Sequence, residues 1–148
     1  MREPAPARAS ARRPQYWLFK TEPGEWSWDD QVRAGAKGSE WTGVRNPVAR
    51  NNLQAMKKGD RGFFYHTGDE KQVIGIVEVV REARPESGDP AWTSVDIAAV
   101  APLKQPVTLA AVKAEPKLAA MALARQPRLS VQPVSEAEWK LVSRMGGL

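Results

Sequence analysis

The stretch FFYHTGDEKQVIGIVEVV (Phe63–Val80) has the pattern of a β-hairpin and decides the fold class. An aromatic run, FFYH, is followed by a polar turn with Gly68 and Asp69, and then by QVIGIVEVV, which is rich in β-branched residues. Aromatic and β-branched residues favour strands, and glycine favours the turn between them. The stretch therefore predicts two antiparallel strands, Phe63–His66 and Gln72–Val80.

Further extended segments lie on both sides of this hairpin. YWLFKT (Tyr16–Thr21) is a short aromatic and aliphatic run that ends before Pro23, and TSVDIAAV (Thr93–Val100) follows the loop sequence PESGDP. Both have the composition of strands that end at turn residues. RQPRLSVQP (Arg125–Pro133), which is bounded by prolines, is also expected to be extended.

Short helices are expected between and after these strands. Their starts are marked by residues that cap helix N-termini, and the last start, Ser135 with Glu138, forms a capping box. The expected helices are Ser27–Val32, Pro47–Lys57, Thr108–Ala114 and a C-terminal helix after Ser135 with Trp139, Val142 and Met145 on one face. Long strands with short helices predict a mixed α+β domain with a curved or closed small sheet.

Composition excludes several classes of site. The 148 residues contain no cysteine and one histidine, His66, so disulfides, zinc–thiolate centres and thiol nucleophiles are absent. We therefore expect no metal and no cofactor. No apolar run reaches the roughly 20 residues that span a bilayer, and the N-terminus lacks the apolar core of a secretory signal. A soluble, cytoplasmic protein is expected, with a monomer favoured.

The charge distribution separates a basic tail from the rest of the chain. The net charge is +5, and residues 1–14 hold four arginines and one glutamate, so three of the five positive charges lie there. This segment is rich in proline and alanine and has no hydrophobic period, so we expect residues 1–15 to be a disordered basic tail and residues 16–148 to form one domain. The net positive charge on the rest of the chain is small, so we expect it to attract nucleic acid only weakly.

The six tryptophans fall into two groups. Trp17 and Trp139 lie on strand and helix patterns and are expected in the core. Trp26, Trp28, Trp41 and Trp92 lie in turn-rich segments, where an indole either covers the core or offers a stacking surface. For Trp26 and Trp41 both interpretations stay open. If Trp41 is a stacking surface, truncating it to alanine should remove base binding and leave the protein folded.

WTGVRN (Trp41–Asn46) places an indole, a glycine, a guanidinium and an amide before a helix. Arg45 can bind a phosphate or a base edge, and Asn46 can read a base through paired donor and acceptor contacts. The simpler interpretation makes Asn46 a helix cap and leaves Arg45 in solvent.

Three other motifs carry polar side chains. Glu22 in KTEP can accept a hydrogen bond from the exocyclic amine of a base, or form a surface ion pair. His66 in FYHT is the lone histidine and has no serine motif beside it, so a structural role is the commoner outcome. In RQPRLSVQP, alternate side chains of an extended segment can face a cleft, or its two arginines can face water.

These motifs occur together, in this order, in EVE-domain proteins, which the chain resembles over Tyr16 to about Val142 through KTEP, WTGVRN, FFYH, GIVEVV and RLSVQPV. The resemblance implies a PUA-like fold, a curved β-barrel with short peripheral helices. It also implies a pocket for one modified base, such as a methylated or hydroxymethylated cytosine. Two departures from the family pattern stand out: Thr21 where serine is commoner, and Pro47 with Val48 after Asn46.

The positions that match the base-binding residues of the family come from all of these motifs. They are Thr21, Glu22, Trp26, Trp41, Val44, Arg45, Asn46, Tyr65, His66, Arg125, Arg128, Leu129 and Ser130. No catalytic residue is assigned.

The first hypothesis is therefore a binding module for a modified nucleobase in DNA or RNA, whose partner is a nucleic acid containing such a base. The chain offers stacking surfaces, guanidinium and amide donors and a carboxylate, but no evident nucleophile with its base. The alternative is a hydrolase of modified nucleosides like the ASCH proteins, with Lys20, Thr21 and Glu22 as the reacting set. A third interpretation is an accessory domain that binds a protein or a small anion.

Overall fold

The strands expected around the hairpin belong to one six-stranded sheet in the computed structural model, which describes residues 13–148. The strands are β1 (Tyr16–Thr21), β2 (Ser39–Glu40), β3 (Arg61–His66), β4 (Gln72–Pro85), β5 (Thr93–Thr108) and β6 (Val131–Val134). The helices are α2 (Trp28–Arg33), α3 (Pro47–Ala55), α4 (Leu109–Ala114), α5 (Ala122–Arg125) and α6 (Glu136–Met145), with a 3-10 helix over Pro116–Leu118. The mixed α+β class is confirmed. Residues 1–12 of the expected tail lie outside the described residues.

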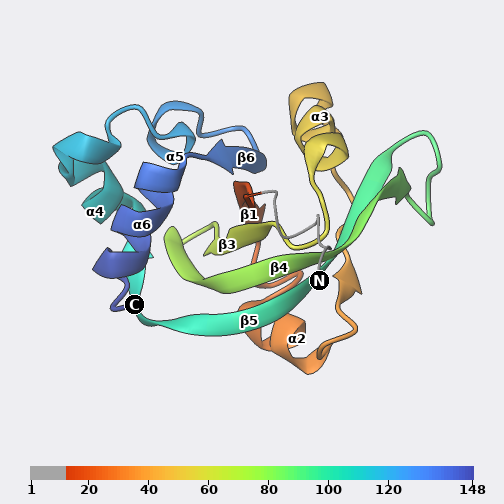
Figure 1. The fold of residues 1–148 in the computed structure, drawn as a ribbon, viewed down its shortest axis with the longest axis horizontal. Helices are drawn as coiled ribbons and strands as arrows, with labels where there is room; N and C mark the ends of the chain where they lie inside the picture. Colours follow the sequence, from red (N-terminus) through yellow and green to blue (C-terminus); the bar gives the residue numbers. More distant parts are fainter. Residues whose placement is uncertain (1–12) are drawn as a thin grey trace, which may run out of the picture.

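The sheet has the order β2-β5-β4-β3-β1-β6 and is open. β1 pairs in parallel with β3 and antiparallel with β6, while the β3–β4 hairpin is antiparallel as predicted. The two edge strands, of two and four residues, do not pair with each other. A closed barrel needs that pairing, so the expected barrel is a curved open sheet here (Figure 1).

The two long strands extend beyond their predicted ends, β4 to Pro85 and β5 to Thr108. Two prolines, Pro102 and Pro106, lie inside β5, although proline cannot donate to a sheet. The ladder accommodates them at irregular positions: Pro102 pairs with Gly75, and the next pair along β5 is Val107 with Val73. These bulges bend the strands, and α4, α5 and α6 gather at one end of the curve (Figure 1).

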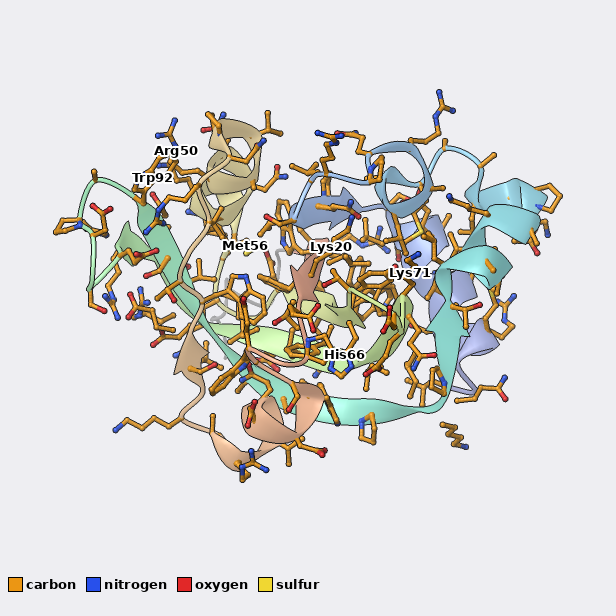
Figure 2. The ribbon with its side chains drawn as sticks, turned by 180° about the vertical axis from the view of Figure 1, so that it is seen from behind. Lys20, Arg50, Met56, His66, Lys71 and Trp92 are labelled. Carbon is orange, nitrogen blue, oxygen red and sulfur yellow. The ribbon has the colours of Figure 1, made fainter. Side chains whose placement is uncertain are left out.

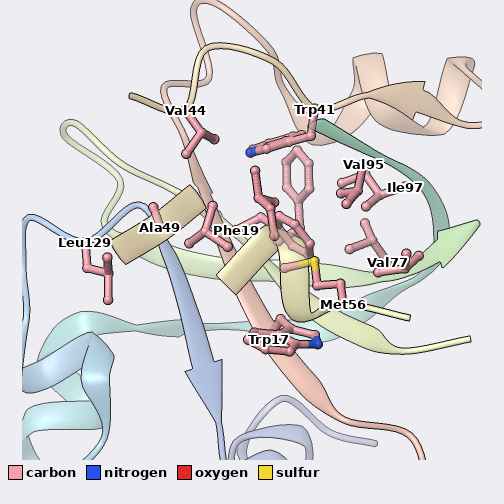
Figure 3. Packing of buried hydrophobic residues seen from close by; sticks show 14 of the residues in the cluster. Trp17, Phe19, Trp41, Val44, Ala49, Met56, Val77, Val95, Ile97 and Leu129 are labelled. Atoms are coloured by element: carbon pink, nitrogen blue, oxygen red, sulfur yellow. The ribbon is translucent and has the colours of Figure 1, made fainter. Parts of the chain in front are cut away.

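Side chains alternate along β1 and β3 and build two separate cores. Trp17 and Phe19 belong to one cluster with Phe64, whereas Leu18 and Phe63 belong to the other. This follows from the period of two along a strand. We call these the first and the second core cluster. Figure 3 shows the first, with residues from β1, α3, β4 and β5 packed together.

Both tryptophans assigned to the core are in these clusters. Trp17 is buried, and its Nε1 donates to Asp60 Oδ2 at 3.0 Å. Trp139 is half-buried and stacks on Tyr16 and Phe63, with ring centroids 4.5 and 4.1 Å away. These α6 contacts cover the second cluster, so the prediction is confirmed for both residues.

Trp28 is the first residue of α2, within the helix expected after Ser27, and its buried indole covers the core. Its ring lies on the backbone of Gly75 in β4, where an added Cβ would come within 2.5 Å of the indole. The missing side chain of Gly75 therefore makes room for Trp28. The Ser27 cap of this helix is confirmed, with a capping box to Asp30.

Two other predicted segments were wrong in part. The helix from Pro47 ends at Ala55 rather than Lys57, because Met56 is extended and the Lys57 amide donates to Asp60 Oδ2 at 3.0 Å. The segment Arg125–Pro133 is not extended throughout: α5 ends at Arg125, a turn follows, and only β6 is a strand. The amide of buried Gln132 holds this turn by donating to main-chain carbonyls, including that of Leu129 at 2.9 Å.

Candidate functional site

A cavity of about 500 Å³ opens where β1 ends, beside β2 and the segment that follows it. We call it the tryptophan cavity, after the two indoles in its wall. Its lining residues are Lys20, Thr21, Glu22, Glu25, Trp26, Ser39, Glu40, Trp41, Thr42, Gly43, Val44 and Ser130. The KTEP and WTGVRN motifs therefore meet here, although 17 residues separate them in the sequence.

Trp26 stands in a tight turn after β1 that is fixed at both ends. Its amide donates to the Glu22 carbonyl, and the Thr21 hydroxyl donates to the Trp26 carbonyl at 2.8 Å. The indole Nε1 donates to Gln31 Oε1 at 2.9 Å, and the Gln31 amide in turn donates to the Ile97 carbonyl. These bonds fix the orientation of the ring before any ligand arrives.

Trp41 is a core residue that also lines the cavity. Its side chain is 8% exposed and meets Phe19 and Phe64 edge to face, with centroids 5.5 and 5.9 Å away (Figure 3). Its amide donates to the Val95 carbonyl of β5 at 2.8 Å. This burial predicts that truncating the residue destabilises the fold, contrary to the expectation from the sequence, because removing a buried indole leaves a large void.

The carboxylate of Glu40 forms a fixed anion in the cavity wall. It accepts hydrogen bonds from the Ser87 hydroxyl, from the Ser94 hydroxyl at 2.7 Å and from the Ser87 amide at 3.0 Å, and it pairs with Arg84. These bonds, that of the Ser87 side chain first, lower its pKa from 4.5 to about 2. Glu40 is therefore ionised at neutral pH.

Arg45 is held away from the cavity by an ion pair. Its two terminal nitrogens donate to the two oxygens of Glu86 at 3.0 and 2.9 Å, and its guanidinium lies over the Trp92 ring. Glu86 also accepts the Gly43 amide at 2.8 Å, and the hydrogen bond from Arg45 is the main cause of its lowered pKa. The pair fastens the WTGVRN segment to the loop after β4.

Asn46 follows the simpler of its two interpretations. Its side-chain oxygen accepts the amides of Val48 and Ala49 at 2.8 and 3.0 Å, so it caps α3, and it does not line the tryptophan cavity. Pro47 occupies the first position of the helix, so this departure from the family pattern leaves the helix start intact.

His66 is a structural residue that positions α2. Its Nε2 accepts the Trp28 amide at 3.0 Å, so its Nδ1 carries the proton that it shares with Glu70 at 2.8 Å. This bond is the main cause of the lowered pKa of Glu70. The ring is buried and does not line the tryptophan cavity.

The remaining predicted residues lie elsewhere. Tyr65 belongs to the second core cluster and lines another cavity. Arg125 is exposed at the end of α5, while Arg128 and Leu129 border a shallow hollow with Asn46. Only Ser130 of this segment reaches the tryptophan cavity.

The structure thus brings together six of the predicted site residues: Thr21, Glu22, Trp26, Trp41, Val44 and Ser130. Sequence analysis missed the contribution of β2, whose Ser39 and Glu40 stand directly before the WTGVRN motif. In the sequence, the one indication that Ser39 and Glu40 belong to the site is their position directly before this motif. Within residues 13–148, no three histidine, aspartate or glutamate side chains are grouped so as to hold a metal ion, and no helix there is long and apolar enough to cross a membrane.

The family model of the EVE domain matches residues 15–145. The chain belongs to the EVE-domain family. This EVE domain is 30% identical to mouse thymocyte nuclear protein 1, over 86% of this chain and 71% of that protein. The predicted resemblance is confirmed.

Solved structures resemble this EVE domain closely. A protein of Agrobacterium tumefaciens is 55% identical, with a TM-score of 0.88 over 90% of this chain and 94% of that one. Human THYN1, in complex with DNA containing 5-methylcytosine, is 30% identical, with a TM-score of 0.82 over 90% and 98% of the two chains. The YTH domain of Zygosaccharomyces rouxii MRB1, in complex with N6-methyladenosine RNA, has a TM-score of 0.56 at 12% identity. At 12% identity, the similarity to the YTH domain is evidence for the fold alone. The expected PUA-like fold is confirmed.

Proposed function

We propose that this EVE domain is a nucleic-acid-binding module that takes one modified base, a cytosine derivative, into the tryptophan cavity. One observation carries the proposal: two fixed indoles and three carboxylates, those of Glu22, Glu25 and Glu40, line a single cavity. Indoles offer a flat apolar surface to a base, and carboxylates accept hydrogen bonds from its amino group. The complex of human THYN1 with DNA containing 5-methylcytosine supports the choice of base.

The cavity suits a base that has left its stack. A volume of about 500 Å³ lies within the range of roughly 300–1,000 Å³ that is usual for small-molecule sites. Trp26 is held by hydrogen bonds at its amide, its carbonyl and its indole nitrogen. A fixed indole loses little freedom on stacking, and each stacked base contributes about 1–3 kcal/mol.

Glu22 is the best placed acceptor for the amino group of cytosine. Glu40 already accepts three hydrogen bonds and pairs with Arg84. Within residues 13–148, the Glu22 carboxylate accepts one hydrogen bond, from the Gly24 amide at 3.1 Å. A carboxylate has about four acceptor positions. Glu22 therefore keeps free positions at the mouth of the cavity.

The test is a binding series with oligonucleotides that differ at one base. Cytosine, 5-methylcytosine and 5-hydroxymethylcytosine are placed at one position in DNA and in RNA, and affinity is measured by fluorescence polarisation. The wild-type protein is expected to prefer one modified base. Glu22→Gln removes the charge while keeping the size, and it should weaken that complex by about 1–3 kcal/mol. The matched control, Glu78→Gln, changes an acid on β4 that does not line the cavity. Equal affinity for all bases would refute the proposal.

A hydrolase of modified nucleosides is the second candidate, because burial lowers the pKa of Lys20 at the cavity wall. A lysine with a lowered pKa is the kind of group that activates a reaction. Here, however, the Thr21 hydroxyl donates to a main-chain carbonyl, and the Lys20 ammonium donates to another, that of Pro127. Neither is directed at the other, which favours binding. Incubation with acylated cytidines and mass spectrometry of the products would decide, since turnover abolished by Lys20→Met would favour the hydrolase.

A further inference from the structure

A second, smaller cavity of about 190 Å³ lies on the other side of Lys20. It is bordered by the turn between β3 and β4, by the start of α4 and by α5. Its lining residues are Lys20, Tyr65, Thr67, Gly68, Lys71, Leu109, Leu123 and Pro127. We call it the lysine cavity. Lys20 lines both this cavity and the tryptophan cavity, and Figure 2 shows it close to Lys71.

The side chain of Tyr65 is buried, but its hydroxyl opens into the lysine cavity. The side chain is 3% exposed, and within residues 13–148 no hydrogen bond reaches its hydroxyl. The oxygen is not sealed off either, since it is absent from the fully buried, unpaired atoms of this region. Burial raises the pKa of Tyr65, so the hydroxyl keeps its proton and can donate. The hydroxyl is therefore open to the cavity and available to a ligand there.

Two lysine residues line the same cavity. Lys20 Nζ lies 5.9 Å from the centre of the Tyr65 ring and donates to the Pro127 carbonyl at 2.8 Å. An ammonium has three donors, so two stay available. Lys71 is exposed and makes no ion pair or side-chain hydrogen bond within the described part of the chain.

The backbone at Lys71 adds a second indication. Among residues 13–148 it is the only non-glycine residue with a positive φ, at 48°. Glycine or asparagine would suit this left-handed position better, because a lysine there costs about 1–2 kcal/mol. The turn itself therefore does not explain why a lysine stands at this position, whereas a cationic side chain beside the cavity does.

Acidic groups near the cavity do not cancel this charge. The Glu22 carboxylate lies beside Gly68, where an added Cβ would come within 2.7 Å of its Oε2. Glu70 is bound to His66. Asp69 is exposed in the same turn, but no carboxylate lines the cavity itself, whose charged lining residues are Lys20 and Lys71. This lining favours an anion with several acceptor oxygens.

We infer that the lysine cavity binds a phosphate group. The inference that this phosphate belongs to the nucleotide whose base enters the tryptophan cavity rests on the proposed function. Lys20 joins the two cavities, so a base on one side and its adjoining phosphate on the other would be bound at once. Phosphate contacts fix the register of a nucleic acid without reading its sequence.

The first experiment measures the phosphate itself. Inorganic phosphate is titrated into the full chain, with chloride at equal ionic strength as reference, and shifts of amide signals are followed by NMR. We expect saturable shifts at Thr67, Gly68 and Lys71, lost in Lys71→Met and reduced in Tyr65→Phe. The matched control Lys37→Met removes an exposed lysine on the loop before β2 and should leave them unchanged. Shifts that are absent, or that survive Lys71→Met, would overturn the phosphate site.

The second experiment identifies the source of the phosphate. An oligonucleotide that binds the wild type is compared with one whose linkage next to the modified base is an uncharged methylphosphonate. Lys71→Met should lower the slope of log affinity against log salt by about 1, and should make affinity insensitive to the neutral linkage. It should leave the preference for the modified base unchanged, which separates this site from the base site.

The outcomes for the two proposals are distinct. Base preference with no effect of Lys71→Met or of the neutral linkage would keep the proposed function and refute the phosphate site. Phosphate binding that depends on Lys71, without any oligonucleotide affinity, would keep the phosphate site and assign it to a free phosphorylated ligand. Lys71→Met is at a surface turn, and its melting temperature confirms that each comparison is made on folded protein.

Discussion

The two cavities on either side of Lys20 differ in how their walls are supported. The tryptophan cavity is lined by Trp41, which is part of the first core cluster, and by Glu40, whose carboxylate is fixed by three hydrogen bonds. The lysine cavity is bordered by a turn and by long side chains, and its tyrosine hydroxyl has no hydrogen-bond partner within residues 13–148. One site is built before its ligand arrives, whereas the other is completed by it.

This difference matches what each cavity is proposed to bind. A flat base requires surfaces at fixed positions, because stacking depends on close contact over the whole ring. A phosphate can be met by flexible ammonium groups that act as point charges. Substitutions in the wall of the tryptophan cavity should therefore alter stability and binding together, and those in the lysine cavity should alter binding alone.

Trp41→Ala should give the largest effect. Emptying a buried indole site costs about 3–5 kcal/mol of unfolding free energy, and base binding should be lost with it. Tyr65→Phe, on the lysine side, removes one hydroxyl without a partner and should change stability by no more than about 0.5 kcal/mol. Urea denaturation of both variants is the measurement. A stable Trp41→Ala protein would show that this indole does not support the core. The two cavities would then not differ in how their walls are supported.

Glu86→Gln should come next. The carboxylate is 5% exposed and pairs with Arg45, which is 43% exposed, so solvent weakens the pair and we expect a loss of about 1–2 kcal/mol. Base affinity should fall as well, because the WTGVRN segment loosens. Asp89→Asn is the control, since Asp89 approaches Arg45 only to 3.8 Å. Equal losses in both variants would argue against a special role for Glu86.

The lowered pKa of Glu40 predicts that the stability of the fold depends on this residue's protonation only at acidic pH. Its pKa falls from 4.5 to about 2 on folding, so its contribution is fully present above pH 4.5 and is lost as pH falls towards 2. Glu40→Gln should flatten the slope of stability against pH in this window. Urea titrations at a series of pH values measure it, and an unchanged slope would contradict the fixed anion in the cavity wall.

Thr21→Val should give the smallest effect. The substitution keeps the shape and removes the hydroxyl that donates to the Trp26 carbonyl, at a cost of about 1 kcal/mol. Thr21→Ser keeps the hydroxyl and should behave like the wild type. Thermal melting and oligonucleotide affinity are measured together. If valine and serine have equal effects, the hydroxyl does not hold the turn around Trp26.

Local patterns predicted much of the fold. The hairpin, strand β1 and the caps Ser27, Asn46 and Ser135 all follow from signals within a few residues, and the structure contains each of them. The ends of β4 and β5 did not follow, because the bulges that accommodate prolines depend on the partner strand.

The site was harder to predict because its residues meet through distant pairing. Arg45 and Glu86 are 41 positions apart, so neither sequence segment reveals that the guanidinium is occupied. The side of the sheet on which Tyr65 lies could have been predicted from the sequence. Consecutive residues of a strand face opposite sides, so Phe64 in the first core cluster already places Tyr65 on the other face.

The position of β1 has a consequence for how the molecule forms. This strand lies between β3 and β6, and Tyr16 is the register partner of Val134, so the earliest strand is completed by the last. Pairings between such distant residues close large loops and slow folding. During synthesis from the N-terminus, Lys20 therefore leaves the ribosome early, yet Ser130 and Pro127 reach it only when most of the chain has followed. The walls of both cavities are therefore complete only once the segment with Pro127 and Ser130 has joined β1.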